Sequence, residues 1–82
     1  MVRVRVLFFA LLREKTKCSE VEWTLPAAAT VGDLWAAVQA AHPPLAPLAG
    51  VVSFAVNREY SDRGRVLQDG DEVALIPPVS GG

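Results

Sequence analysis

The sequence is poor in the residues from which metal sites and disulfides are built. Its 82 residues contain one cysteine, Cys18, and one histidine, His42. A single cysteine excludes an internal disulfide and a four-cysteine metal site, and it cannot complete a metal site with one histidine alone. We therefore expect a chain that binds no metal.

Charge of one sign and long apolar runs are also missing. Eight basic and nine acidic residues leave a formal net charge of −1, whereas a nucleic-acid-binding surface needs a basic stripe. No apolar run approaches the length of a membrane span, and the first residues lack the pattern of a signal peptide. We expect a cytoplasmic protein with neither nucleic acid nor a membrane as a partner.

Apolar side chains, by contrast, are abundant. Hydrophobic residues make up 51% of the sequence and the mean hydropathy is +0.28, which is high for one small domain. We expect such a chain to leave an apolar patch exposed, and an exposed patch indicates a protein partner.

The first strand shows where that patch should lie. Residues 2–9 alternate with period two, which predicts a strand. One face carries only apolar residues, namely Val2, Val4, Val6 and Phe8. The other face ends in Leu7 and Phe9, although a face turned wholly to water would stay polar along its length. We assign the first face to the core and the apolar end of the second to the surface.

The rest of the chain predicts one main helix among short strands. Thr30 and Asp33 have the spacing of a capping box, and His42 precedes two prolines, so the helix is expected between them. The other expected elements are a helical turn at 10–14, a loop at 14–19, strands at 20–25, 51–56 and 72–76, a loop or short helical turn at 45–50, a polar loop at 60–65, a very short strand at 66–67 and a tight turn at 68–71.

This order predicts an α+β fold, a mixed sheet with the helix packed on one face. The first and last strands are the most apolar, so both should be central. If they are neighbours, the helical crossover between them makes the pair parallel. Leu7 and Phe9 would then lie beside the start of the C-terminal segment, residues 77–82.

The C-terminal segment should leave the domain, which we place at residues 1–76. Pro77 and Pro78 cannot continue a sheet ladder, so residues 77–82 are expected to form a flexible, extended arm with a reach of roughly 20 Å. The two last glycines would leave the terminal carboxylate unhindered. Taken alone, the segment is equally compatible with an ordinary frayed end.

Four segments of the sequence have the pattern of a known family. They are Val-Leu-Phe-Phe-Ala followed by Arg13-Glu14, Ala55-Val56-Asn57, the run from Leu67 to Ala74, and Pro-Pro-Val-Ser-Gly-Gly at 77–82. Over its whole length the sequence resembles the small subunits of molybdopterin synthase, a family of ubiquitin-like β-grasp sulfur carriers.

The resemblance implies a function for Gly82. In this family the corresponding carboxylate is adenylated with ATP by a partner that resembles the ubiquitin-activating enzymes, and sulfur from a donor protein replaces AMP to give a thiocarboxylate. The large synthase subunit, partner in a heterotetramer, then uses this sulfur on the cyclic pterin precursor of the molybdenum cofactor. The chain itself would bind no cofactor and would be a sulfur-donating subunit without a catalytic base.

The resemblance also implies which residues matter. Gly82, with Gly81 beside it, would be the reacting terminus. The residues expected to contact partners are Leu7, Phe9, Arg13, Tyr60, Pro77, Pro78, Val79 and Ser80.

Three classes of function stay open on sequence alone. The chain could be a sulfur carrier, for molybdopterin or for a thiazole or tRNA-thiolation pathway. It could be a ubiquitin-like modifier joined through Gly82 to lysines. It could also be an interaction domain with an inert tail. Cys18 lies in a polar segment and could be a surface thiol, and the sequence assigns it no role.

Overall fold

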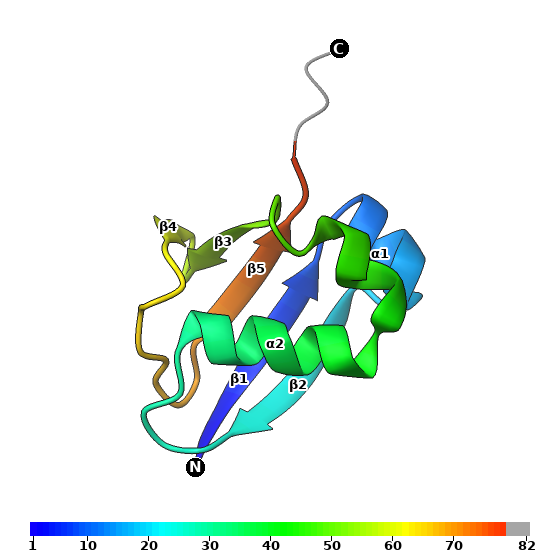
Figure 1. Cartoon of the computed structure of the whole chain (residues 1–82). Helices are drawn as coiled ribbons and strands as arrows, with labels where there is room; N and C mark the ends of the chain where they lie inside the picture. Colours follow the sequence, from blue (N-terminus) through cyan, green and yellow to red (C-terminus); the bar gives the residue numbers. More distant parts are fainter. Residues whose placement is uncertain (79–82) are drawn as a thin grey trace.

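The computed structural model describes residues 1–78, and in this part of the chain five strands form one mixed sheet (Figure 1). The strands are β1 (Val2–Phe8), β2 (Glu20–Leu25), β3 (Ser53–Val56), β4 (Glu59–Ser61) and β5 (Glu72–Ile76), in the spatial order β2-β1-β5-β3-β4. The helical elements are α1 (Leu11–Thr16), α2 (Val31–Ala41) and the 3₁₀ helix η1 (Pro43–Leu48). The predicted α+β class is confirmed.

Helix α2 begins and ends where its sequence signals place it. Thr30 Oγ1 accepts from the Asp33 backbone N–H at 3.2 Å, and the Thr30 N–H donates to Asp33 Oδ2 at 2.9 Å, which completes the capping box. At the other end the His42 N–H donates to Val38 O, and Pro43 follows as the first residue of η1. The helix lies across one face of the sheet (Figure 1).

Strand β5 is the middle strand of the sheet and β1 is its interior neighbour, and the two are parallel as predicted. Leu7 lies opposite Ala74, and the chain between the strands includes α2. Parallel strands bring their carboxyl ends to the same edge of a sheet. The N–H of Phe9 donates to Leu75 O at 3.3 Å, so the end of β1 lies beside the end of β5, where Pro77 begins the C-terminal segment.

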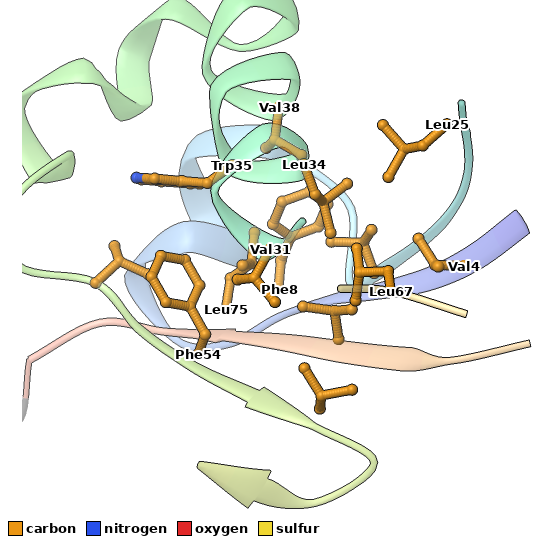
Figure 2. Close-up of a cluster of buried hydrophobic side chains, with 14 of the residues drawn as sticks. Val4, Phe8, Leu25, Val31, Leu34, Trp35, Val38, Phe54, Leu67 and Leu75 are labelled. Carbon is orange, nitrogen blue, oxygen red and sulfur yellow. The ribbon is translucent and has the colours of Figure 1, made fainter. Parts of the chain in front are cut away.

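The core lies between α2 and the sheet (Figure 2). Phe8 is 1% exposed, whereas Phe9, the next residue, is 45% exposed, so the predicted assignment of the two faces is confirmed. From α2 the core receives Val31, Leu34, Trp35 and Val38. Trp35 also donates from Nε1 to Ala49 O at 3.1 Å, which satisfies its only polar atom.

The predictions were wrong at three boundaries. Helix α1 continues to Thr16, whose Oγ1 donates to Leu12 O at 2.9 Å, and it ends at Lys17 with φ of 62°. Strand β3 begins at Ser53 rather than 51, because the Val51 N–H donates back to Leu48 O in a turn. The segment expected as a very short strand contributes one isolated bridge, between Thr30 and Val66.

The predicted polar loop at 60–65 was also wrong, because its start belongs to β4. Tyr60 pairs with Ala55 in an antiparallel hairpin, and Asn57 and Arg58 form the turn. A three-residue edge strand exposes most of its side chains to water, so its sequence is polar and carries little alternation.

Two negative observations concern residues 1–78. None of the helices described there is long and apolar enough to cross a membrane. In the same residues, no three His, Cys, Asp or Glu side chains are grouped so as to hold a metal ion.

Candidate functional site

Helix α2 covers one face of the sheet, and in residues 1–78 the opposite face carries a broad, shallow cavity of about 510 Å³. We call the ten residues that line it the open-face cavity. They are Arg5, Leu7, Phe9, Glu20, Ala55, Arg58, Tyr60, Glu72, Ala74 and Ile76. Eight lie in the strands β1, β2, β3, β4 and β5, Phe9 directly follows β1, and Arg58 directly precedes β4.

One end of the open-face cavity is apolar. Strand register places Leu7 opposite Ala74, Ala74 opposite Ala55, and Ala55 opposite Tyr60, so an apolar row crosses four strands. Phe9 lines the same cavity and is 45% exposed, and Tyr60 is 78% exposed. Large apolar side chains left exposed on one contiguous surface are typical of protein-binding sites.

The other end of the cavity is charged. Arg5 lies 3.6 Å from a carboxylate oxygen of Glu20 and 2.5 Å from one of Glu72. Outside the cavity, Arg3 lies 3.7 Å from Glu22. Ion pairs this exposed contribute little to stability, about 0–1 kcal/mol each. These charged side chains occupy one end of the cavity, so its apolar surface lies at the other end, where the C-terminal segment begins.

The β3–β4 turn is fastened to the sheet. Asn57 donates from Nδ2 to Asp71 Oδ1 at 2.9 Å, and its Oδ1 accepts from the Glu72 N–H at 3.0 Å. The Asn57 N–H donates to Glu72 O at 2.8 Å. These bonds hold the hairpin so that Arg58 and Tyr60 form one wall of the open-face cavity.

The structure brings together some of the residues that sequence reasoning singled out. Leu7, Phe9 and Tyr60 line one cavity, although Tyr60 is about fifty residues from the other two in the sequence. Arg13 is exposed on α1 and does not line it. Pro77 and Pro78 directly follow β5. The predictions for Val79, Ser80, Gly81 and Gly82 lie outside the described residues. The partner-binding role of all these residues stays a prediction.

Sequence reasoning missed several residues of the cavity. Ala74 and Ile76 could have been found, because alternation in β5 places them on the face opposite Val73 and Leu75. Arg58 and Ala55 could not be assigned, because their place depends on the β3–β4 hairpin. Cys18 does not line the cavity: its Sγ lies 3.6 Å from Thr16 O at the end of α1.

A mixed sheet of this order, with one helix across one face and the other face left open, defines a ubiquitin-like β-grasp protein. A solved ubiquitin from Caldiarchaeum subterraneum has the same fold, with a TM-score of 0.66 at 18% identity over 99% of this chain and 98% of that one. Residues 6–82 match the profile of the ThiS family. The chain belongs to the ThiS family.

Curated relatives narrow the comparison within this class. A Chlamydomonas reinhardtii protein named "Molybdopterin synthase sulfur carrier subunit" is 43% identical over 84 residues, which cover 99% of this chain and 100% of that protein. A human protein of the same name is 39% identical over 85 residues, covering 100% of this chain and 97% of that protein. The resemblance found in the sequence is confirmed.

Solved structures agree with the sequence relatives and add two observations. A putative molybdopterin converting factor subunit 1 from Pyrococcus furiosus has a TM-score of 0.88 at 32% identity, over 96% of this chain and 100% of that one. The small archaeal modifier SAMP1 from Haloferax volcanii has a TM-score of 0.84 at 33% identity, over 98% of this chain and 99% of that one. A Helicobacter pylori complex of subunits 1 and 2 of the molybdopterin-converting factor contains a chain with a TM-score of 0.73 at 28% identity, over 99% and 100%.

Proposed function

We propose that this chain is the sulfur carrier subunit of a molybdopterin synthase and that its reactive group is the carboxylate of Gly82. The observation that carries the proposal is the end-to-end similarity to relatives of that name, at 43% identity over 99% of the chain in the first case. The match to the ThiS family covers residues 6–82 and so extends to Gly82.

The proposed chemistry needs an activated carboxyl group. A carboxylate at neutral pH is a poor electrophile, and adenylation with ATP by an activating partner supplies the leaving group that it lacks. Sulfur at the sulfide level, supplied through a donor protein, then forms a C–S bond to the Gly82 carbonyl carbon as the C–O bond to AMP breaks, and this leaves a thiocarboxylate. The thiocarboxylate sulfur attacks the cyclic pterin precursor, and water cleaves the acyl C–S bond and restores the Gly82 carboxylate. In this proposal the chain supplies the reacting terminus and no catalytic base.

The open-face cavity would supply binding energy for this chemistry. Docking through Leu7, Phe9 and Tyr60 at one end of the sheet would position the terminus that begins at Pro77, and binding remote from the reacting atom is a general way to orient it. The complex formed by the Helicobacter pylori relative supports a large subunit as the docked partner. The activating enzyme, the sulfur donor, a heterotetrameric synthase and a cytoplasmic location belong to the same proposal.

A second candidate is a protein modifier joined through Gly82 to lysine side chains. The 33% identity to a small archaeal modifier protein favours it specifically. Carriers for thiazole synthesis or tRNA thiolation are a third alternative within the same chemistry, since they would carry the same thiocarboxylate to another acceptor.

Intact-mass measurement separates these functions. The chain is co-expressed with a ubiquitin-activating-type enzyme and a sulfur source, and we expect the mass gain of one sulfur replacing one oxygen. High-mass conjugates would instead identify a modifier, and an unchanged mass would contradict both. Adding the large subunit and the pterin precursor to the purified thiocarboxylate should then return the mass to its original value; failure to do so would point to another sulfur acceptor.

Gly81→Val is expected to slow both adenylation and sulfur transfer without changing the fold. A β-branched side chain adds bulk beside the reacting carbon and restricts a backbone that glycine leaves free. Single-turnover rates with each partner and far-UV circular dichroism measure the two effects. Normal rates with both partners would show that neither enzyme encloses the residue before the terminus.

A further inference from the structure

The two arginines of the open-face cavity differ in their partners. Arg5 lies within ion-pair distance of both carboxylates that line the cavity, those of Glu20 and Glu72. Arg58 has no carboxylate within 4.0 Å among residues 1–78. The cavity therefore presents one guanidinium, at its β3–β4 wall, whose charge the described residues do not pair.

Arg58 also occupies a backbone position that suits glycine. It is the second residue of a two-residue hairpin turn, in which Asn57 has φ of 50° and Arg58 has φ of 71°. Hairpin turns with two positive φ angles favour Asn-Gly, because a Cβ atom is strained at the second position. Asn57 at the first position follows this preference, whereas Arg58 stands at the second position in place of the preferred glycine. A residue held in an unfavourable backbone conformation at the wall of an exposed cavity is a basis for a hypothesis of function.

Location limits what that function can be. Arg58 shares its wall of the cavity with Tyr60, beyond the apolar row, and the turn is fastened by the Asn57 bonds to Asp71 and Glu72. A partner that covers the apolar row thus also covers the Arg58 guanidinium beside it. A carboxylate is the group that an arginine binds in two-point geometry, and an unpaired charge under an interface disfavours partners that lack its complement.

We propose that Arg58 is a specificity determinant of the open face and that it receives an acidic side chain of the large synthase subunit. This inference rests on the proposed function and adds the chemistry of the partner: an apolar segment over Leu7, Phe9 and Tyr60, with a carboxylate at its β4 side. Arg58 is a binding residue and touches no reacting atom.

Arg58→Gly tests the proposal because its two effects have opposite signs. Glycine relieves the positive-φ strain, so the melting temperature of the isolated chain is expected to rise by roughly 2–6 °C. The same change removes the guanidinium, so the Kd for the large subunit is expected to increase about tenfold at low ionic strength. The difference in Kd between wild type and Arg58→Gly should shrink as salt is added. Arg58→Lys keeps the charge and is expected to restore part of the affinity.

Lys17→Gly is the matched control. Lys17 also has a positive φ, 62°, is exposed, and does not line the open-face cavity. Its replacement removes the same charge and relieves the same kind of strain, so the melting temperature should rise while the Kd stays unchanged.

Calorimetric titration of the large subunit with the wild type and these variants decides the matter. An Arg58→Gly chain that binds like the wild type at low salt overturns the inference and leaves the proposed function intact. Equal losses in Arg58→Gly and Lys17→Gly also overturn it, because they indicate a general charge effect. A wild-type chain that neither binds the large subunit nor forms a thiocarboxylate overturns the proposed function, and this inference with it.

Discussion

A chain that lacks Gly82 is expected to fold normally and to transfer no sulfur. The proposed chemistry takes place at one α-carboxylate, so deleting Gly82, or adding one residue after it, moves the carboxylate away from the position that the partner enzymes recognise. Residues 77–82 follow the last strand, and residues at the end of a domain contribute little to its stability. The melting temperature and far-UV circular dichroism should match the wild type, while sulfur transfer to the cyclic pterin precursor is lost.

The extended variant is the more demanding version of this experiment. It keeps every wild-type residue and changes only which residue carries the carboxylate. Its intact mass is checked after the assay, because removal of the added residue by a protease would restore the wild type. A variant that stays extended and keeps full activity would refute the assignment of the reactive group to the terminus.

Among the variants proposed for this chain, Phe8→Ala is expected to lower the free energy of unfolding most. Phe8 is 1% exposed on the core face of β1, and its ring meets the His42 ring edge to face with centroids 5.9 Å apart. Truncating a buried phenylalanine lowers the free energy of unfolding by roughly 3–5 kcal/mol. In a domain of this size each kcal/mol corresponds to about 4–8 °C in melting temperature, so thermal melts should show an unmistakable shift.

Phe9→Ala is the matched partner of Phe8→Ala, since the same side chain is truncated one residue further on. Phe9 is 45% exposed in the open-face cavity, so the isolated mutant should melt nearly as the wild type does. Its affinity for the large subunit is expected to fall by about 2 kcal/mol, roughly thirtyfold, as for an aromatic anchor at an interface. Calorimetric titration measures this loss.

The pair of mutants separates docking from packing. Unfolding of Phe9→Ala would mean that its ring stabilises the domain rather than a complex. Wild-type affinity in a folded Phe9→Ala chain would remove Phe9 from the proposed interface. In either case Tyr60 and Leu7 would have to be tested in the same way before the open-face cavity could be retained as the docking surface.

The elements that could be predicted from the sequence are those with strong local signals. The capping box of Thr30 and Asp33 and the prolines after His42 bound α2 through nearby hydrogen bonds and steric limits. Period-two alternation assigned Phe8 to the core and Phe9 to the surface, because neighbouring side chains of a strand point to opposite faces. Strand β4 carried no such signal, since three residues at an edge show little periodicity.

The sequence by itself determined two features of the candidate site. They are the Gly-Gly terminus after two prolines and the apolar carboxyl end of the first strand. Only the tertiary structure decided that Leu7, Ala74, Ala55 and Tyr60 form one row, because this depends on the order and register of four strands. Alternation within a strand assigns each residue to a face, but which strands become neighbours depends on turns and crossovers that join distant parts of the chain. For the same reason Arg58, an ordinary loop residue in the sequence, is found beside that row in the folded chain.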